Sequence, residues 1–513
     1  MEAHSERRFN LVDEGWIAVA GQGLVGLRRI FADDSLRALG GNPVQKIALI
    51  KLLLAIAQAA WTPENDNEWA RYSAAGMAQK TLRYLEEKKD LFWLYGDKPF
   101  LQMPAISKAK SQTLGALLPE VATGNTTILF QSQIEGVFSE VDKALLLVLI
   151  TGFALGGKKT DNSIVLSSDY TGKTNEKGRP SASKSGPSLG YLGYLHNFLN
   201  GKSLLETIWL NLITQKHIEE LPQFEAGLGV APWESMPEGE CCPVAEKLKK
   251  SLMGRLVPLC RFVYLSSQDI HYSEGIIHPT HKDGGFDPTI AVDFSKSPKA
   301  LWADPGKRPW RELTSLLSFF DATGNRSYEC PQLRIGFPRA RTVVPEFGVW
   351  SGGLRVSSNA GEQYVSGADD FVESEVRFAS QWLGDIWFAH LKTEMGLIEN
   401  VSKVVYASAS AYFKQQKSDG KNHAAAACNL FWQLSEKQFQ NLVNACGDTS
   451  GKQAQEMRRH FVNFGHTAYN AYCPRDTARQ IEAWAAHRPN LGRVLSNPSE
   501  NQNDKRSTQK RRK

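Results

Sequence analysis

The chain has 513 residues, of which 42% are hydrophobic, and 60 Lys and Arg residues against 54 Asp and Glu give it a formal net charge of +6. Because domains typically run to ~100 to 200 residues, this length predicts two or three domains. The longest apolar runs, 47–61 and 144–155, are shorter than the ~20 residues that span a bilayer, and Lys51 and Gln58 interrupt the first run. The composition therefore predicts a soluble globular protein without a membrane segment.

The N-terminus and the cysteines indicate the compartment. The first ten residues, MEAHSERRFN, contain no apolar stretch of the kind found in a secretory signal. The seven cysteines are odd in number and scattered, and neither the adjacent Cys241 and Cys242 nor Cys260 belongs to a CxxC pair. We therefore expect a cytoplasmic protein with reduced thiols and without a structural zinc site.

The positive charge is concentrated at the C-terminal end. The last fifteen residues, SENQNDKRSTQKRRK, contain six basic and two acidic residues, so they carry +4 and the rest of the chain only +2. A nucleic-acid surface must then be a local patch on a nearly neutral body. Residues 491–513 are typical of a disordered basic tail, which either adds salt-sensitive affinity for phosphates or only improves solubility.

The N-terminal part shows short strands and helices. Residues 9–19 alternate apolar and polar positions, which predicts a strand with a turn at Glu14-Gly15, and a second short strand near 24–30 can pair with it. Asn42 and Pro43 supply an N-cap and a first-turn proline for a helix. Apolar positions at helical spacing predict that this helix is buried in the core: Ile47, Ile50, Leu54 and Ala57.

The segment 123–133, TGNTTILFQSQ, places Phe130 between side chains that form hydrogen bonds, including Gln131. An aromatic ring between amides can stack on a splayed base. The alternative is that Phe130 ends a buried strand. The residues alone leave both interpretations open.

The longest loop signal runs from residue 156 to residue 190. A loop of this length inside a compact chain is usually functional or disordered. Gly172-Lys173-Thr174 is not part of a phosphate-binding P-loop, because Ser167 stands where that motif requires its first glycine. Basic side chains interleaved with Gly and Ser nevertheless predict contacts to a phosphate backbone. These basic residues are Lys173, Lys177, Arg179 and Lys184.

Residues 350–364, WSGGLRVSSNAGEQY, predict a polar loop with three glycines at a domain junction. Gly352 and Gly353 permit close backbone approaches, and Ser358 and Asn359 have short hydrogen-bonding side chains. This combination suits a wedge placed against a DNA groove or base step, whereas an ordinary turn between domains has the same composition. Three arginines just before the loop predict phosphate contacts beside it: Arg334, Arg339 and Arg341.

The histidines form the one cluster with metal-ligand character. His271, His278 and His281, with Asp283, suggest a metal-dependent nuclease as the alternative function. Their spacing matches no common zinc pattern. The sequence also contains no HExxH, GxSxG or Walker A motif, so we expect a non-catalytic protein without a metal or another cofactor.

The pattern after residue 371 predicts helices at 371–397, 400–417, 421–445 and 452–488, the last broken at Cys473-Pro474. Long helices with short connections predict a four-helix bundle. Its expected core stripe consists of Val376, Phe378, Trp382, Ile386, Trp387 and Leu391.

These features predict an α+β protein in which a large mixed domain precedes a helical bundle. The mixed α/β domain is expected at 1–366, the four-helix bundle at 367–490 and the basic tail at 491–513.

Five stretches resemble one known family when they are taken in their order along the chain. They are NLVDEGWIAV near the N-terminus, DKPFLQMPAI at 97–106, TGNTTILFQ at 123–131, GKSLLETIWLNLIT at 201–214, and GGLR before the helical part. In this order they resemble the large subunit (CasA family) of the type I-E CRISPR Cascade complex. The resemblance covers about residues 8 to 496.

The resemblance implies a non-catalytic subunit that reads the protospacer-adjacent motif in duplex DNA and promotes R-loop formation. In such complexes, guide pairing reads the sequence while the protein reads a short motif and duplex shape. The implied partners are crRNA, double-stranded target DNA, the backbone, crRNA 5′-handle-binding and small subunits, and the helicase-nuclease that the subunit recruits.

The resemblance also implies site residues. The family's aromatic residue near the crRNA 5′ handle and its neighbour correspond to Phe130 and Gln131, and its minor-groove glycine loop falls within Gly178 to Gly186. Its DNA wedge corresponds to Ser358, Asn359 and Ala360, which follow the turn Gly352-Gly353-Leu354-Arg355.

The chain departs from the family pattern at several of these positions. Leu354 replaces an aromatic residue, and no Lys is present at 266–268, where the family has a minor-groove lysine. The zinc-binding cysteines of some members are missing around 241–265.

Overall fold

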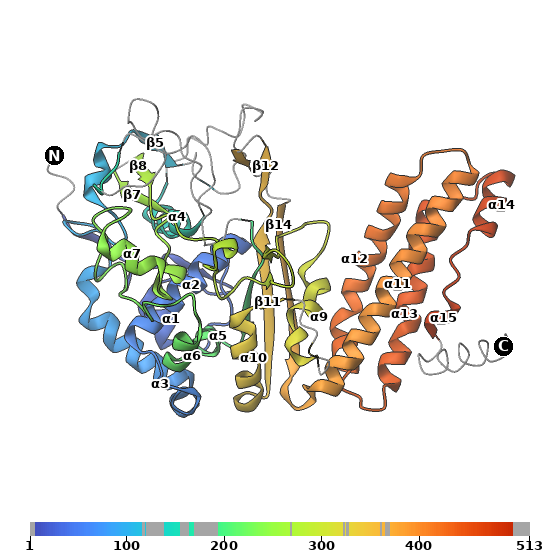
Figure 1. Ribbon diagram of the computed structural model, residues 1–513, viewed down its shortest axis with the longest axis horizontal. Coiled ribbons are helices and arrows are strands. Elements are labelled where there is room, and N and C mark those ends of the chain that lie inside the picture. Colours follow the sequence, from blue (N-terminus) through green and yellow to red (C-terminus); the bar gives the residue numbers. More distant parts are fainter. Residues whose placement is uncertain are drawn as a thin grey trace. The chain divides into compact units, whose positions relative to one another are not determined.

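The computed structural model divides into two compact units (Figure 1). The mixed unit comprises Met1–Leu316 and Ser327–Glu375, and the helical unit comprises Leu317–Arg326 and Val376–Lys513. For residues 358, 359 and 362–364 the structure describes the backbone alone. The described residues are 6–114, 118, 138–153, 164–168, 193–266, 269–321, 324, 328–359, 362–364 and 370–495.

The mixed unit contains helices of very different lengths, and α2 is the central one. It contacts α3, α4, α5, α8 and the strand β11. The helices described in this unit are α1 (Leu27–Ala32), α2 (Pro43–Ala60), α3 (Asp66–Glu87), α4 (Glu140–Gly152), α5 (Leu204–Asn211), α6 (Gln215–Glu220), α7 (Pro243–Lys249), α8 (Met253–Leu256), α9 (Leu313–Leu316) and α10 (Pro331–Val343).

The start and the burial of α2 confirm its prediction from the sequence. The Asn42 side chain accepts a hydrogen bond from Gln45 N at 3.0 Å, and Asn42 N donates to the Gln45 side chain at 2.9 Å, which makes a capping box. Each fully buried Leu or Ile of this helix contributes about 1.5 to 3 kcal/mol. Although α2 is long and apolar enough for a membrane span, 78% of it is buried inside the structure, as in a core helix.

The strands of the mixed unit form small sheets with antiparallel pairing. One sheet has the order β14-β11-β6 and another the order β5-β8-β7, while β1–β4, β2–β3, β9–β10 and β12–β13 pair separately. The strands are β1 (Arg8–Asn10), β2 (Ile17–Val19), β3 (Gly23–Val25), β4 (Trp93–Tyr95), β5 (Ser111–Thr113), β6 (His196–Asn200), β7 (Arg261–Leu265), β8 (Asp269–Glu274), β9 (Val292–Asp293), β10 (Lys299–Ala300), β11 (Glu346–Leu354), β12 (Ser357–Asn359), β13 (Glu362–Tyr364) and β14 (Phe371–Ala379).

The segment 9–19 contains two short strands, β1 and β2, and the predicted turn at Glu14-Gly15 lies within the connection 11–16 between them. The predicted pairing with a second strand is confirmed: Ile17 lies opposite Val25, and Val19 lies opposite Gly23. The second strand ends at Val25, however, and the rest of the predicted segment forms α1.

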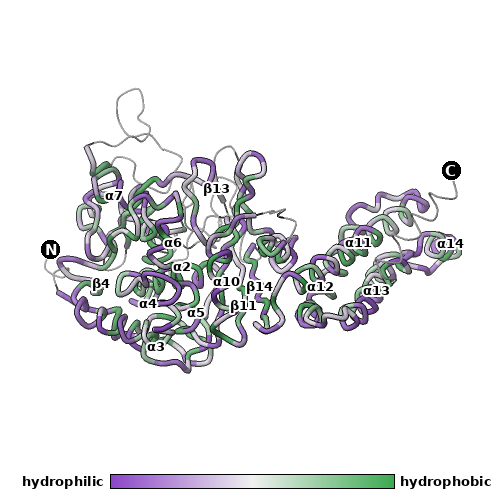
Figure 2. Tube along the Cα trace, turned by 60° about the horizontal axis from the view of Figure 1, so that its bottom comes forward, coloured by the Kyte–Doolittle hydropathy of each residue, from purple (hydrophilic) through white to green (hydrophobic). Residues whose placement is uncertain are grey.

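The helical unit consists of α11 (Asp385–Gln415), α12 (Lys421–Ala445), α13 (Lys452–Tyr472), α14 (Ala478–Ala486) and α15 (Gly492–Leu495). Helices α11, α12 and α13 contact one another, and α14 contacts α11. Along their length these helices alternate between apolar and polar positions, as amphipathic helices do (Figure 2). The predicted break at Cys473-Pro474 is confirmed, because α13 ends at Tyr472.

The predicted helices at 371–397 and 400–417 are wrong in their boundaries. Residues 371–379 form the strand β14, and one continuous helix, α11, spans residues 385–415. Four positions of the expected core stripe are buried, but Trp382 is 52% exposed and Ile386 is 62% exposed. Val376 and Phe378 are buried as residues of the strand β14, whereas Trp382 lies in the short turn that follows it and Ile386 lies on the exposed side of α11.

Candidate nucleic-acid interface

The predicted wedge segment is a β-hairpin rather than a loop. Ser357 lies opposite Tyr364, Ser358 opposite Gln363, and Asn359 opposite Glu362. The two residues that join these strands, 360 and 361, lie outside the described residues. The hairpin extends beyond the end of β11, so the wedge prediction falls on a hydrogen-bonded element (Figure 1).

The glycines before the hairpin are buried in β11, where close packing explains them. A Cβ on Gly352 would lie 2.5 Å from the Trp350 ring and 3.1 Å from Val372 O. A Cβ on Gly353 would lie 2.5 Å from Tyr194 O. Both positions therefore exclude any larger side chain. Their predicted contact with DNA stays a prediction.

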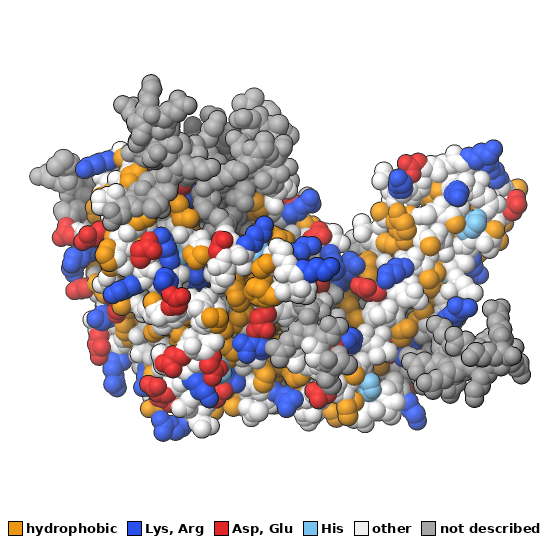
Figure 3. Space-filling model, viewed as in Figure 1, with side chains coloured by type: hydrophobic (Ala, Val, Ile, Leu, Met, Phe, Trp, Pro, Cys, Tyr) orange, Lys and Arg blue, Asp and Glu red, His pale blue; other side chains and the backbone are white. Residues whose placement is uncertain are grey.

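Arg355 is the basic residue at the base of the hairpin. Its side chain is exposed, while its backbone N–H donates to Asp370 O at 2.9 Å. Basic side chains occur on the face shown in Figure 3, below the atoms drawn in grey. The exposed guanidinium is available for a phosphate contact of the kind that the sequence predicts.

Most other predicted contact residues lie outside the described residues. The structure therefore leaves their predicted roles as predictions. They are Phe130, Gln131, Lys173, Lys177, Gly178, Arg179, Lys184, Gly186 and Ala360.

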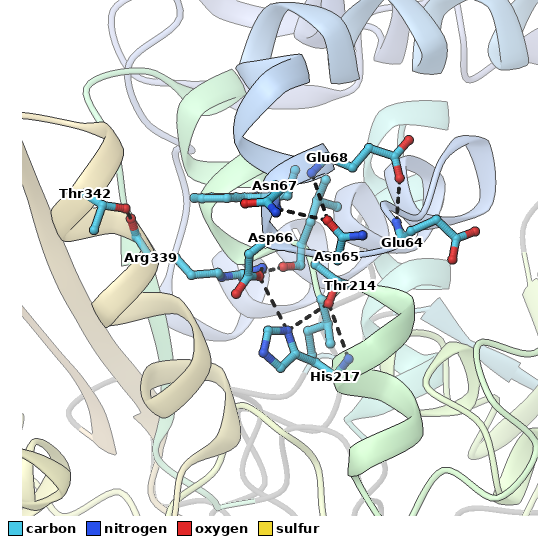
Figure 4. A network of polar contacts seen from close by, with 12 residues as sticks. Glu64, Asn65, Asp66, Asn67, Glu68, Thr214, His217, Arg339 and Thr342 are labelled. Atoms are coloured by element: carbon cyan, nitrogen blue, oxygen red, sulfur yellow. Dashed lines mark hydrogen bonds and ion pairs between the residues drawn. The ribbon is translucent and has the colours of Figure 1, made fainter.

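Arg339, which the sequence assigned to phosphate contacts, is a structural residue. Its Nη2 donates to Leu212 O at 2.7 Å and its Nη1 to Asp66 Oδ1 at 3.3 Å (Figure 4). Its guanidinium also lies 4.5 Å from the centroid of the Trp69 ring. Only 6% of the residue is exposed. The phosphate prediction for Arg339 is therefore wrong, because the side chain is buried between α10 and α3.

The neighbouring arginine Arg334 is engaged as well, since its Nε donates to Glu329 Oε1 at 2.5 Å. Asp66 Oδ1, which accepts the hydrogen bond from Arg339, also lies 3.7 Å from His217 Nδ1 (Figure 4). Burial lowers the pKa of His217, and the positive Arg339 lowers it further against the opposing effect of Asp66. These contacts make an internal polar network that joins α3, α6 and α10.

The three histidines of the nuclease alternative have separate structural partners. His278 Nε2 lies 2.7 Å from Pro258 O, and its Nδ1 lies 2.9 Å from Arg255 Nη1. His281 Nδ1 lies 3.2 Å from the Tyr194 hydroxyl, and His271 Nδ1 lies 2.8 Å from Ala109 O.

Both ring nitrogens of His278 are occupied by hydrogen bonds, which opposes metal binding there, and its low pKa makes it a weak general base. Burial and the adjacent Arg255 guanidinium lower the pKa of His278 to about 3. The short distance to a carbonyl requires that Nε2 carries the proton, so Nδ1 accepts from Arg255. Within the described residues, no group of three His, Cys, Asp or Glu side chains is arranged to hold a metal ion.

A cavity of about 280 Å³ lies between α2, α5 and the sheet β14-β11-β6. Trp350, Phe198 and Ile50 supply apolar walls. Glu373 in its lining accepts from Lys46 Nζ at 2.7 Å and from Trp350 Nε1 at 3.2 Å. Among the described residues that line the cavity there is no His or Cys, so they form no Cys-His or Ser-His pair.

The comparisons with known proteins agree on one family. The chain matches the family model of the CRISPR-associated protein Cse1 over residues 10–468. The CRISPR-associated protein CasA/Cse1 of Thermus thermophilus is 31% identical over 238 residues, which are 43% of this chain and 43% of that protein. The matched part thus spans less than half the length of this relative.

Solved structures show the same fold over nearly the whole chain. Thermobifida fusca Cse1 is similar with a TM-score of 0.74 and 20% identity, over 95% of this chain and 98% of that one. Thermus thermophilus CasA has a TM-score of 0.71 and 18% identity, over 95% and 99%. A structure described as a CRISPR RNA-guided surveillance complex has a TM-score of 0.65 and 13% identity, over 95% and 100%.

The predicted fold class is confirmed, because a mixed part with small sheets precedes packed C-terminal helices in this chain. Since the family model matches most of the sequence, the chain belongs to the Cse1 (CasA) family of CRISPR-associated proteins.

Proposed function

We propose that this chain is the large, non-catalytic subunit of a type I-E RNA-guided surveillance complex that recognises the protospacer-adjacent motif in duplex DNA. Family membership is the observation that supports the class of function. Two solved structures with the same fold are described as RNA-guided surveillance complexes, one of them in a pre-nicking state. The proposed partners are crRNA, duplex target DNA, the other Cascade subunits and the helicase-nuclease.

The hairpin β12–β13 supports a role in opening the duplex. Its paired strands hold Ser358 and Asn359 on a backbone with little conformational freedom, which is what a wedge between base pairs requires. Unstacking one base step costs a few kcal/mol. A rigid wedge offsets part of that cost before guide pairing begins.

The charge distribution supports the proposal that tight binding needs the assembled complex. Outside the last fifteen residues the chain carries a net charge of only +2. Because phosphate neutralisation dominates non-specific affinity, the isolated chain is expected to be monomeric and to bind duplex DNA weakly at physiological salt. Tight, motif-independent binding by the isolated chain would contradict the proposal.

The wedge role is tested by replacing Ser358, Asn359 and Ala360 together with glycine in the assembled complex. R-loop formation is then measured on a fully paired target and on a target already mismatched beside the motif. The variant should slow R-loop formation much more on the paired target, because the bases of the mismatched one are already unpaired. Assembly and crRNA binding should be unchanged.

The matched control replaces Ser418 and Asp419 with glycine, in the polar connection between α11 and α12. This variant should leave both rates unchanged. Equal slowing of both targets by the hairpin variant would mean that the hairpin is not a wedge.

A further inference from the structure

Trp302 is a large aromatic residue that the mixed unit leaves 45% exposed. Its ring stacks on the ring of Tyr194, with centroids 4.5 Å apart and 28° between the planes. Tyr194 itself is only 2% exposed. The pair therefore presents one aromatic ring to solvent on top of a buried one.

The backbone around Trp302 holds this ring in a fixed position. Tyr194 and Trp302 form an antiparallel bridge. On either side of that bridge, Leu195 N donates to Leu301 O at 3.0 Å, and Ala303 N donates to Gly193 O at 2.8 Å. A ring that is already ordered loses little entropy when it binds a planar partner.

Tyr194 is fixed from its other side as well. Its hydroxyl lies 3.2 Å from His281 Nδ1, and the two rings meet edge to face with centroids 5.8 Å apart. The Tyr194 side chain therefore cannot swing away from Trp302 without breaking a hydrogen bond. Trp302 rests on a rigid support.

This platform lies at the base of the hairpin β12–β13. Gly193 has a φ of +66°, and a Cβ built on it would lie 3.0 Å from the Trp302 ring and 3.3 Å from Val356 Cβ. Trp302 and Val356 therefore flank the same small space. Val356 directly precedes Ser357, the first residue of β12.

The chain near the platform offers cations to a phosphate backbone. Arg355, the neighbour of Val356, has an exposed side chain, and so has Lys299, which lies opposite Asp293 in the β9–β10 pair. The exposed carboxylate of Asp304, two residues after Trp302, accepts from Gly306 N at 2.9 Å and keeps its negative charge. An ordered aromatic ring near an exposed cation such as Arg355 is a usual surface for an unpaired nucleotide.

We propose that the exposed ring of Trp302 stacks on an unpaired base of the target DNA that the hairpin has separated. The inference rests on the proposed function, since it needs an opened duplex at β12–β13. Stacking uses the π-face that every base has, so the site is tolerant of base identity. The stacking site stabilises the opened duplex and does not recognise the bases of the motif.

The test uses the assembled complex and duplex targets that carry the fluorescent base 2-aminopurine at one position beside the motif, scanned position by position. Unpairing makes 2-aminopurine brighter, whereas stacking on indole quenches it. In the complex with unaltered Trp302, one position should be unpaired but remain dim. Trp302→Leu, which keeps an apolar contact with Tyr194 but has no π-face, should brighten that position several-fold.

The same variant should shorten the lifetime of the opened complex by about fivefold or more, which is the lower end of the contribution of one stacked base. Trp302→Phe should restore part of the quenching. The control is Trp382→Leu, because Trp382 is similarly exposed at 52% but lies in the helical unit. That control should change neither brightness nor lifetime.

Three outcomes overturn the inference. In the first, Trp302→Leu leaves every probe position and the lifetime unchanged while motif-dependent opening persists, and the proposed function then stands without the stacking site. In the second, Trp302→Leu releases the subunit from the complex, and Trp302 is then a protein contact. In the third, the complex with unaltered Trp302 does not open motif-bearing duplex at all, so the proposed function fails first.

Discussion

Arg458 and Glu394 form a buried ion pair with two hydrogen bonds between α13 and α11. Arg458 Nε donates to Glu394 Oε2 at 2.9 Å, and Nη2 donates to Oε1 at 2.6 Å. The side chains are 6% and 5% exposed. This buried pair fixes how far α13 is shifted along α11, because both hydrogen bonds form only when Arg458 and Glu394 lie at the same level of the two helices.

Removing one member of this pair should destabilise the helical unit strongly. Glu394→Ala leaves the Arg458 guanidinium buried without its carboxylate, which costs about 3 to 5 kcal/mol. Denaturant unfolding of the chain measures the loss. The double variant Glu394→Leu, Arg458→Met removes both charges together and should recover most of the stability. A double variant as unstable as Glu394→Ala would show that the pair itself, rather than the uncompensated charge, matters.

Substitution of Arg339 should affect folding stability, whereas substitution of Arg355 should affect DNA binding. Arg339→Ala should lower the free energy of unfolding by about 1.5 to 3 kcal/mol, the range for buried hydrogen bonds to charged groups. Arg355→Ala, at an exposed position, should change it by less than about 0.5 kcal/mol. In the assembled complex, Arg355→Ala should weaken DNA binding and reduce the salt slope by about one. A stable Arg339→Ala variant together with a destabilised Arg355→Ala variant would contradict the structural role of Arg339 and the DNA contact of Arg355.

Regular periodicity explains which parts of the fold were predictable. Helix α2 is indicated by Asn42, Pro43 and an apolar spacing of three to four residues, all of which act within one helix. Strand β14 alternates with period two, since Val372, Val376 and Phe378 are buried on one side. The alternation is visible in the sequence, but it runs directly into the helical pattern of α11, and that pattern therefore predicts a helix over residues 371–379 as well.

The candidate site was less predictable, because it depends on contacts between distant segments. No local sequence feature distinguishes the buried Arg339 from the exposed Arg355, because the partners of Arg339, Asp66 and Leu212, come from other parts of the chain. The sequence also did not single out Trp302 as a binding residue, because its position is set by a bridge to the distant Tyr194. The glycines of β11 were noticed correctly, but their cause is packing against Trp350 and Tyr194.

Neutralising the basic residues of the segment 171–190 should weaken binding to all targets alike. Lysine is a point charge without a planar fork, so we expect phosphate contacts rather than base contacts from these side chains. The salt slope of the assembled complex should fall by about one unit per lost contact. The variant replaces Lys173, Lys177, Arg179 and Lys184 with Gln.

The matched control for this variant is Lys249→Gln with Lys250→Gln, since these amines already pair with Glu246 and Glu225. The control should leave the salt slope unchanged. Loss of discrimination between motifs at a constant salt slope would instead assign the segment to base reading.

The last prediction concerns the stability of the mixed unit in acid. In the folded chain, burial and Arg255 lower the pKa of His278 to about 3, whereas an unfolded His titrates near 6.5. Below about pH 6.5 the unfolded state therefore binds one more proton than the folded state, and stability falls as the pH falls. The stability that the neutral ring contributes is fully present above pH 6.5 and is lost progressively toward pH 3. Between pH 6.5 and pH 5 this single group should cost about 1.5 kcal/mol.

His278→Gln isolates this effect, because its amide can still donate to Pro258 O but does not titrate. Denaturant unfolding at several pH values should show the unaltered chain losing about 1.5 kcal/mol more than the variant between pH 6.5 and pH 5. Between pH 7 and pH 8 the two curves should run parallel, since the ring is neutral in both states there. Parallel curves down to pH 5 would mean that His278 takes up a proton without unfolding, and the neutral Nδ1 acceptor assigned to Arg255 would then be wrong.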